Sequence, residues 1–456
     1  MNFKKTVAIV TAAGAMAAIS VPAMALENEF HGMYRAFGFM TNGFSGDSKF
    51  NLAADSATDK FVEQRARLMY IAKANDDLKL VTHFELDTKF GGSSSTKYPI
   101  GDGGGLDADR ISLETKNVYL DFKIPSTPVR AMVGIQPFND AFQGTFGLFD
   151  ATGAVFTGKA GDLTATYGYF TVGNSNTSFD YKATPNGIAD TGTNFPSNKG
   201  SQDLNVIDLK YAVNKNLTVG TSYYMQLDKV GTTNVTVAKN TVGLNAATKV
   251  GPLDLAASFG LQFGKSGVTT LTNTGTTAFG GSVVGKIAAG PGKIDVSALY
   301  LSGDKDAAGY NHAWQSIGTG VNYFNAANMW LLVRNGAEIN TATQIGGSSD
   351  ITRGGHGLMG VFAGYEGTAG KVFYNANVGY ARVAEKQTAY SSSIGTELNA
   401  TVGYKLYDNM SASFTGAYAI LGDGYGKENV MLLNGATVGK SYDNPFMTNI
   451  ALNYAF

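Results

Sequence analysis

Charged side chains that recur at every second position are the residues of this sequence best suited to chemistry in water. In residues 61–73, an extended chain would place alternate side chains on opposite faces. One face then carries Val62, Ala66, Leu68, Tyr70 and Ala72, and the other carries Glu63, Arg65, Arg67 and Lys73. In residues 78–90 the polar face consists of Lys79, Val81, His83, Glu85, Asp87 and Lys89. Charges that line a water-filled space set its ion preference, because they lower the barrier for one sign.

The same alternation extends this water-facing set to other predicted strands. Near mid-depth the set would include Arg35, Arg65, Arg67 and His83, and nearer one end Lys79, Lys123 and Arg130. The acids among them would be Glu63, Glu85, Asp87 and Asp121. Because acids and bases share the same strands, we expect only weak selectivity between cations and anions. The alternative, that a given charge is merely solvated, stays open for each residue.

Residue patterns typical of catalysis are missing from the sequence. It has no Gly-x-Ser-x-Gly elbow, no His-Glu-x-x-His pair and no complete Walker pattern. The histidines, His31, His83, His312 and His356, are scattered, and no cysteine is present. Carboxylates gather at 102–109 and 304–306, but neither spacing matches an EF-hand loop, so solvated side chains are the preferred interpretation. We therefore predict no enzyme activity, no cofactor and no metal site.

Short turns and long polar connections alternate along the chain. The predicted turns are at 75–77, 125–128, 160–162, 214–216, 251–252, 290–292, 366–370 and 408–409. The predicted long connections are near 41–60, 91–110, 138–152, 172–202, 229–239, 264–276, 302–356, 384–392 and 422–444. Turns on one side and long loops on the other are typical of outer-membrane barrels. The chain therefore predicts an all-β fold, a transmembrane antiparallel up-and-down β-barrel of about 18 strands.

Two segments leave the strand number open between sixteen and twenty. Residues 321–333, VNYFNAANMWLLV, are too apolar for a solvated loop and would form a short helix in the pore mouth or an additional hairpin. A weak strand at 154–159 would lower the number if it merged with its neighbours. The composition agrees with a barrel, since charged residues make up 16% of the chain and 58 residues are glycine. Soluble domains average roughly 25% charged residues and ~7% glycine.

The first 25 residues have the features of a secretory signal peptide. Lys4 and Lys5 precede an apolar run over 6–20, and Ala23-Met24-Ala25 is a small-x-small cleavage site. Residues 26–456 would then form a single barrel domain. No other stretch approaches the ~18 to 20 apolar residues of a spanning helix. A closed barrel can still cross a bilayer, because closure leaves no backbone polar group facing lipid.

The final strand, residues 445–456, has one face suited to hydrocarbon and one suited to water. The apolar face carries Phe446, Thr448, Ile450, Leu452, Tyr454 and Phe456. An alternating last strand that ends in Tyr-x-Phe resembles the closing strand of Gram-negative outer-membrane porins. The resemblance implies that Tyr454 and Phe456 belong to a signal read by the barrel-assembly machinery. It also implies an outer-membrane location in contact with lipid, and a homotrimer.

Residues 138–153 resemble the third loop of porins, which folds inside the barrel and narrows the channel. By that resemblance Asp140 and Asp150 supply the acidic side of a pore constriction. Its opposite side would carry Arg35, Arg65, Arg67, His83 and Arg130, with Glu85 among the bases. The alternative is an outward loop whose aromatic residues cover the rim.

Together these features predict a porin through which small hydrophilic solutes and ions diffuse passively. Two alternatives stay open. One is a substrate-specific transporter with a discrete binding site in the lumen, and the other is a barrel that sheathes an electron-transfer partner. The formal net charge of -1 argues against a nucleic-acid partner, since such proteins usually carry a basic surface.

Overall fold

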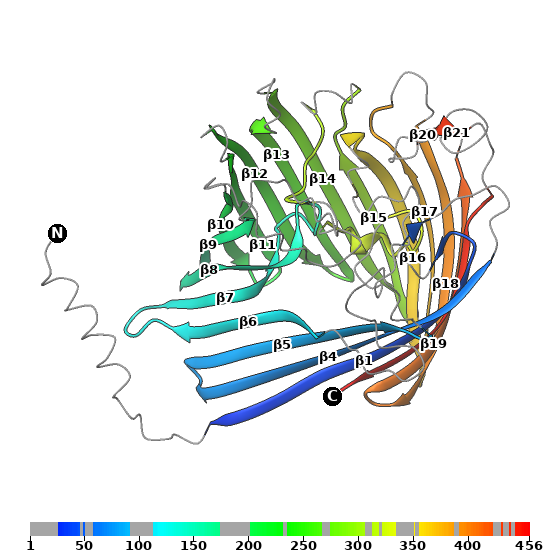
Figure 1. The fold of residues 1–456 in the computed structure, drawn as a ribbon, viewed down its shortest axis with the longest axis horizontal. Coiled ribbons are helices and arrows are strands. Elements are labelled where there is room, and N and C mark those ends of the chain that lie inside the picture. The colour runs from blue at the N-terminus through cyan, green and yellow to red at the C-terminus, as the bar shows by residue number, and fades with distance from the viewer. Residues whose placement is uncertain are drawn as a thin grey trace, which may run out of the picture.

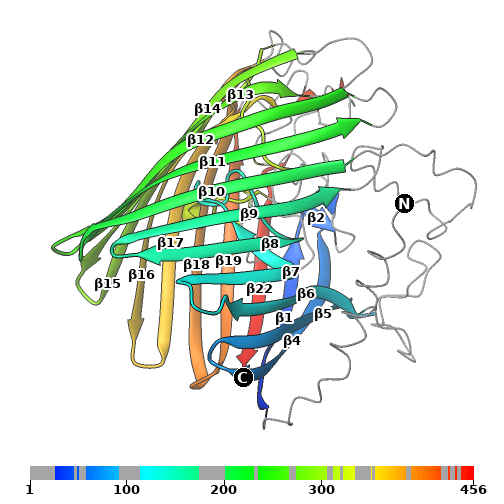
Figure 2. The ribbon, with the colours of Figure 1, turned by 90° about the vertical axis from the view of Figure 1, so that its left-hand side faces the viewer.

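Eighteen long strands form one closed antiparallel barrel in the computed structural model (Figures 1 and 2). The structure describes residues 26–45, 49–50, 58–91, 113–173, 201–230, 235–266, 274–305, 312–318, 322–333, 351, 355–386, 392–422, 430–431, 437–438 and 443–456. The predicted signal peptide, residues 1–25, and the carboxylate cluster at 102–109 lie outside the described residues.

Each long strand is antiparallel to the next one along the chain, and the barrel closes where β1 pairs with both β4 and β22. The long strands are β1 (Glu27–Thr41), β4 (Asp59–Asn75), β5 (Leu78–Lys89), β6 (Glu114–Lys123), β7 (Val129–Asn139), β8 (Leu148–Ala160), β9 (Leu163–Gly173), β10 (Ser201–Asn214), β11 (Leu217–Val230), β12 (Val235–Val250), β13 (Leu253–Ser266), β14 (Thr274–Ala289), β15 (Gly292–Leu301), β16 (Leu358–Ala369), β17 (Val372–Arg382), β18 (Ser393–Tyr407), β19 (Met410–Leu421) and β22 (Phe446–Ala455). Two short pairs, β2 (Phe44–Ser45) with β3 (Lys49–Phe50) and β20 (Val430–Met431) with β21 (Thr437–Val438), are separate from the barrel. The predicted all-β class and number of strands are confirmed.

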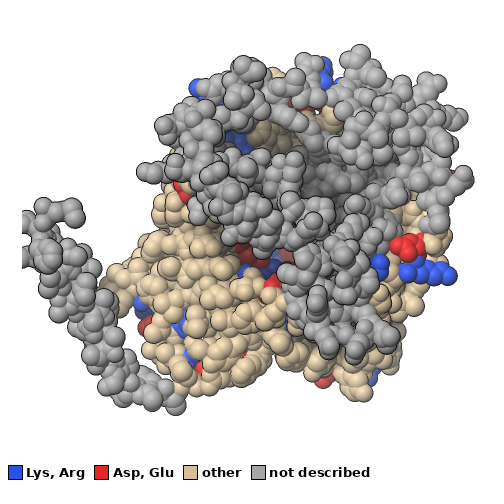
Figure 3. Space-filling model, in the orientation of Figure 1, with Lys and Arg blue, Asp and Glu red and all other residues tan. Residues whose placement is uncertain are grey.

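Alternation along each strand separates a polar inner wall from an apolar outer wall. Residues that lie opposite each other in register share a face, so Arg35, Arg65 and Asn453 all project into the lumen. The residues between them project outward, and Leu68 and Ile450 are 50% and 66% exposed there. Charged side chains cover little of the described surface in Figure 3. An exterior of this kind suits hydrocarbon, whereas the inner wall suits water.

Short turns join neighbouring strands at one end of the barrel, and all have two residues except the five-residue turn between β6 and β7. Gly161 and Gly251 both have a φ of 59°, and a Cβ at either position would meet no atom within 4 Å. Backbone conformation, not packing, therefore favours glycine in these turns. The turn predicted at 366–370 is shorter than expected, because Glu366 stays in the ladder opposite Asn375 and β16 continues to Ala369.

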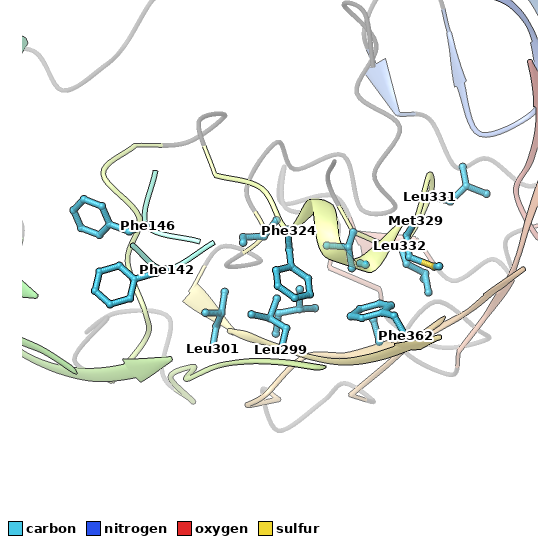
Figure 4. Packing of buried hydrophobic residues seen from close by; sticks show 14 of the residues in the cluster. Phe142, Phe146, Leu299, Leu301, Phe324, Met329, Leu331, Leu332 and Phe362 are labelled. Atoms are coloured by element: carbon cyan, nitrogen blue, oxygen red, sulfur yellow. The ribbon is translucent and has the colours of Figure 1, made fainter. Parts of the chain in front are cut away.

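The largest apolar cluster lies inside the barrel (Figure 4). Two segments between strands form it together with the inner wall: residues 140–147, after β7, and the described residues of 312–333, after β15. The second segment contains the 3-10 turn η1 (Asn325–Ala327) and no strand within its described residues. Of the two predicted conformations for 321–333, the additional hairpin is therefore wrong for residues 322–333, and the helix is a single turn. None of the helical structure in the described ranges has the length and hydropathy needed to cross a bilayer.

Candidate functional site in the barrel lumen

The inner faces of β1 and β4 to β7, here called the charged wall, carry most of the predicted constriction residues. Arg65 donates two hydrogen bonds of 2.6 Å to the Asp87 carboxylate and lies 3.2 Å from Glu85. Arg67 donates to the second oxygen of Glu85. Paired strands thus bring Arg65, Arg67 and Glu85 together, as their spacing suggested. Glu85 bridges two guanidinium groups, so much of the positive charge is compensated within the wall.

A second group of ion pairs lies nearer the turns. Arg130 contacts Asp121 at 2.5 Å, and Lys79 lies 3.6 Å from the other oxygen of the same carboxylate. Arg130 is therefore separate from the Arg65 cluster and belongs to a different row of the wall. Arg35 lies opposite Arg65 in register, so three arginines, Arg35, Arg65 and Arg67, occupy neighbouring positions.

His83 and Asp150 are connected through β6. His83 Nδ1 lies 3.2 Å from Asn117 Oδ1, and Asn117 Nδ2 donates to Asp150 Oδ1 at 2.7 Å. Lys116 Nζ contacts the other oxygen of Asp150 at 2.6 Å. Asp150 lies within β8, and its carboxylate is shared by an amide and an ammonium group. The arrangement places Asp150 beside bases of the charged wall instead of across the lumen from them.

Asp140 organises the segment 140–147 that follows β7. One carboxylate oxygen accepts backbone N–H groups of Phe142 and Gly144 at 2.8 and 2.7 Å. The other accepts those of Phe146 and Gly147, each at 2.6 Å. Desolvation raises the pKa of Asp140 to about 6, because its effect exceeds the opposing effect of the four N–H donors. All four contacts lie within the segment, so Asp140 stabilises the folded conformation of residues 140–147.

The segment 140–147 packs against the inner face of β11 to β13. The Phe142 ring meets Tyr224 of β11 edge to face at a centroid distance of 5.4 Å, and Phe146 lies 5.1 Å from the same ring. A Cβ at Gly243 would lie 2.1 Å from the Phe142 ring, and one at Gly260 would lie 2.8 Å from Trp314. We call the inner face of β12 to β14 the glycine wall, because its missing side chains make room for these aromatic groups.

The second inward segment docks on the first, a feature that sequence reasoning missed. Trp314 Nε1 donates to the Thr145 carbonyl oxygen at 3.1 Å, and its ring lies 5.9 Å from that of Phe142. Backbone bonds of 2.9 Å also run from Ile317 N to Phe146 O and from Tyr323 N to Gly144 O. The unusual apolar character of 321–333 was the available signal, because so many apolar residues in a solvated loop would be unfavourable.

Glu397 of β18 is a further residue that the sequence analysis did not single out. Its side chain is completely buried, and it accepts backbone N–H groups of Trp330, Leu331 and Leu332 at 2.8 to 2.9 Å. A lone acid on an otherwise neutral inner face, in the pattern Glu397, Asn399, Thr401, was the signal that could have identified it. The carboxylate satisfies three consecutive backbone donors and so holds the second segment against the wall.

A polar cavity of about 280 Å³ remains beside the second inward segment. Its lining comes from β1, β16 to β19, β22 and the segment itself: Arg35, Phe37, Asn328, Trp330, Glu366, Asn375, Asn377, Thr401, Ser413, Thr415, Asn449, Ala451 and Asn453. Of the predicted constriction residues, Arg35 alone appears in this lining. The cavity therefore lies where the charged wall ends at β1 and the largely uncharged inner face of β16 to β19 and β22 begins.

No protein-family model and no curated protein matches this chain. Its fold is similar to that of OpdK from Pseudomonas aeruginosa crystallised with vanillate, at 12% identity and a TM-score of 0.55, over 94% of this chain and 98% of that one. OccAB1 from Acinetobacter baumannii is 12% identical with a TM-score of 0.53, over 94% and 96% of the two chains. OccK2 (OpdF) from Pseudomonas aeruginosa is 10% identical with a TM-score of 0.53, over 94% and 98%. At such identities the likeness is one of fold.

Proposed function

We propose that this protein is a channel of the Gram-negative outer membrane that passes small hydrophilic solutes and selects among them at a site in its lumen. The observation that carries the proposal is a closed barrel, apolar outside, whose polar lumen is narrowed by two inward segments beside a cavity of about 280 Å³. A barrel with sixteen or more strands leaves an aqueous channel unless something fills it. The inward segments fill part of it and leave a space of small-molecule size.

Selective passage replaces the general diffusion expected from the sequence. The OpdK structure contains vanillate, a small aromatic carboxylate, and its barrel has a similar fold. A general pore needs only a wide lumen, whereas a selective one needs groups that contact the solute. The polar cavity offers such groups at a point where the lumen is narrowed.

The charged wall is proposed to attract ions of both signs with little preference. Arg65, Arg67 and Arg130 each have an acidic partner, and Glu85 serves two of the arginines. Paired charges largely cancel at distances beyond the pair, so a passing ion meets a weak field. His83 and Asp150 would contribute through the Asn117 network, whereas Asp140 would act on the shape of the channel by folding the segment 140–147.

The remaining alternative, a sheath around an electron-transfer partner, is disfavoured by the space available. The two inward segments occupy lumen volume that a protein partner would need, and the contacts of Glu397 with Leu331 and of Phe142 with Tyr224 hold them there. A partner would have to displace both segments and leave the backbone N–H groups of Trp330, Leu331 and Leu332 without their carboxylate acceptor, which is costly.

Assembly is proposed to use the closing strand. Phe456 exchanges two backbone hydrogen bonds with Gly32 of β1, of 2.9 and 3.0 Å, and its ring stacks with that of Tyr454 at 5.5 Å. The two aromatic rings would form the proposed signal for the barrel-assembly machinery. The same contacts fasten the last strand to the first, so recognition and closure would involve the same residues.

A homotrimer is also proposed, through the outer face of β1, β4 and β5. Tyr34 donates to Gln64 Oε1 at 2.8 Å, and Gln64 Nε2 donates to Thr88 at 2.6 Å. These groups project outward, since they alternate with lumen residues such as Arg65. Polar groups facing hydrocarbon are unfavourable, so contact with another copy would stabilise this face.

Ion current across a planar lipid bilayer tests the channel proposal. The purified full-length chain should give stable, stepwise conductance with a permeability ratio close to one. Saturable block of that current by a small solute would establish selectivity. A correctly folded barrel that inserts into the bilayer but carries no current would overturn the proposal.

A further inference from the structure

The cavity beside the second inward segment has a lining dominated by amide and hydroxyl groups. Eight of its residues are asparagine, threonine or serine: Asn328, Asn375, Asn377, Thr401, Ser413, Thr415, Asn449 and Asn453. Trp330 and Phe37 supply aromatic rings. We call this space the asparagine pocket. Amides and hydroxyls both donate and accept hydrogen bonds, so the pocket can match a solute that does the same.

The orientation of the amides is fixed by a ladder that starts at Glu397. Asn399 Nδ2 donates to Glu397 Oε1 at 2.9 Å and to the Asn328 carbonyl oxygen at 3.0 Å. Asn377 Nδ2 donates to the side-chain oxygens of Asn399 at 2.8 Å and Asn375 at 3.0 Å. Both amide hydrogens of Asn377 are thereby used, and Asn375 must present its oxygen to Asn377. Asn375 Nδ2 is left to donate to a solute.

Asn449 adds an unsatisfied donor to the same pocket. Its side chain is only 1% exposed, and its Nδ2 is buried without a hydrogen-bond partner. A buried donor without an acceptor destabilises the folded barrel. A donor of this kind in the lining of a cavity is explained if an occupant supplies the acceptor.

Charge in the pocket is balanced. Arg35 and Glu366 are its two ionisable residues, and Glu366 also contacts Lys286 at 3.2 Å. A site for anions would need cations without nearby acids, but Glu366 lines the same pocket as Arg35, and Arg65 and Arg67 of the neighbouring charged wall are paired with Glu85 and Asp87. Hydrogen bonding, not net charge, therefore distinguishes the asparagine pocket from the rest of the lumen.

We propose that the asparagine pocket binds an uncharged polyhydroxylated solute of about one sugar ring, as the selective site of the channel function proposed above. Asn375 and Asn449 lie in one register row, three strands apart, so hydroxyls on opposite sides of such a solute would accept from them. The half-buried Trp330 indole would cover an apolar C–H face of the ring. Typical sites of ~300 to 1,000 Å³ hold drug-sized ligands, so the cavity volume of about 280 Å³ suits a smaller molecule.

Block of single-channel current by D-glucose tests this proposal, with Asn449→Leu as the main variant. Leucine keeps the branch at Cγ, although it is larger than asparagine, and it removes an unsatisfied donor without leaving a new one. D-glucose should reduce the wild-type current saturably, after correction for bulk conductivity. The half-blocking concentration should rise about tenfold in Asn449→Leu and in Asn375→Leu, since one lost hydrogen bond to a ligand has roughly this effect.

Asn245→Leu is the matched control, because Asn245 also projects inward, opposite Ser258, but lies outside the pocket. Its half-blocking concentration should stay within about twofold of wild type. Ion current without solute tests the channel itself, and its absence would overturn the proposed function. A conducting channel that D-glucose does not block would overturn only the sugar site. An equal rise of the half-blocking concentration in Asn245→Leu and Asn449→Leu would do the same. Stronger, Asn449-dependent block by benzoate or lysine would overturn it too, in favour of a charged solute.

Discussion

The charged wall and the glycine wall have the same strand geometry, but the charged wall faces water in the lumen and the glycine wall is covered by the inward segments. On the charged wall, long side chains such as Arg65 and Asp87 reach each other across neighbouring strands and leave the wall facing water. On the glycine wall, Gly243 and Gly260 expose backbone, and aromatic rings of the inward segments cover it. Both walls share the alternation of inward and outward side chains that is typical of these barrels. The size and charge of the inward-facing side chains then decide whether a wall lines the water-filled channel or packs against the inward segments.

The charged wall and the covered side of the lumen, where the inward segments lie, also satisfy their polar groups differently. The carboxylates of the charged wall meet side-chain cations, whereas Glu397 and Asp140 meet backbone N–H groups of the inward segments. An ion pair between side chains tolerates small movements. A carboxylate that satisfies several backbone donors at once specifies one conformation, because any shift leaves buried donors unsatisfied. The covered side of the lumen should therefore be the more sensitive to single substitutions.

Glu397→Gln should have the largest effect, since it breaks the attachment of the second inward segment while keeping the side-chain shape. One acceptor oxygen becomes an NH₂ group that faces backbone donors of Trp330, Leu331 or Leu332. We expect docking of the segment to weaken by roughly 2 to 4 kcal/mol, and single-channel conductance to rise several-fold.

Ser258→Ala is the control for that substitution, because Ser258 is also buried on the inner wall, shares one hydrogen bond of 2.9 Å with Ser282 and lies outside the asparagine pocket. It should leave conductance nearly unchanged. Equal conductance in Glu397→Gln and wild type would mean that the segment does not narrow the conducting path.

Gly243→Ala should have the next largest effect, because its new Cβ would lie 2.1 Å from the Phe142 ring. Overpacking of this kind costs roughly 1 to 3 kcal/mol, so residues 140–147 should undock more often. The chain has no cysteine, so maleimide labelling of a Gln143→Cys variant reports the exposure of the segment. Labelling should accelerate in the Gly243→Ala background.

Gly416→Ala is the matched control, since a Cβ there would meet no atom within 4 Å. Labelling that accelerates equally in the Gly416 variant would point to general loosening of the barrel instead.

Glu85→Gln probes the charged wall and should change selectivity without changing conductance greatly. It leaves Arg67 without its carboxylate and Arg65 with Asp87 as its remaining partner. One charge at ~7 Å in water contributes ~0.6 kcal/mol, and screening in ~0.1 M salt reduces this to ~0.3 kcal/mol. Anions and cations are affected in opposite directions, so the anion-to-cation permeability ratio should rise about two- to threefold. Reversal potentials in a salt gradient measure this ratio. Asp254→Asn, which removes an acid paired with Lys249 at 3.4 Å near a turn, should shift it less.

The strands could be predicted from the sequence because the alternation of polar and apolar residues is a local pattern. The contacts inside the lumen could not, because they join residues that are far apart in the chain. The polar and apolar faces of β4 and β5 follow from neighbouring residues alone. Their pairing does not, since continuing from Asn75 opposite Leu78 would place Arg65 opposite Thr88. The irregularity between Lys73 and Asn75 places Arg65 opposite Asp87 instead. A bulge of this kind has no clear sequence signal here.

The inward segments illustrate the same limit over longer distances. Leu331 and Leu332 depend on Glu397 in a strand that follows much later in the chain, and Phe142 depends on the absence of a side chain at Gly243. High glycine content indicated a barrel in general. The register of several strand pairs decides which glycine faces which aromatic ring, and this register does not follow from the sequence alone.

The smallest effect that we expect is a pH dependence of the segment 140–147, confined to the covered side of the lumen. The pKa of Asp140 is raised from 3.8 to about 6 in the docked segment, because desolvation outweighs the backbone hydrogen bonds. A raised pKa means that the docked state holds the proton more tightly than an undocked one. The stabilisation of docking by this proton is therefore complete below about pH 4 and is lost as pH rises through 6. Above that range the stability of docking no longer depends on the titration of Asp140.

Fluctuations of single-channel current between pH 4.5 and 7.5 should accordingly become more frequent as pH rises, with a midpoint near 6. Asp140→Asn cannot titrate, so its fluctuations should be frequent at every pH, since the amide also lacks one of the two acceptor oxygens. Asp150→Asn should retain the wild-type pH profile, because Asp150 serves Lys116 and Asn117 and not the segment. A profile that persists in Asp140→Asn would assign the titration to the charged wall, and the two sides of the lumen would then not respond to pH separately.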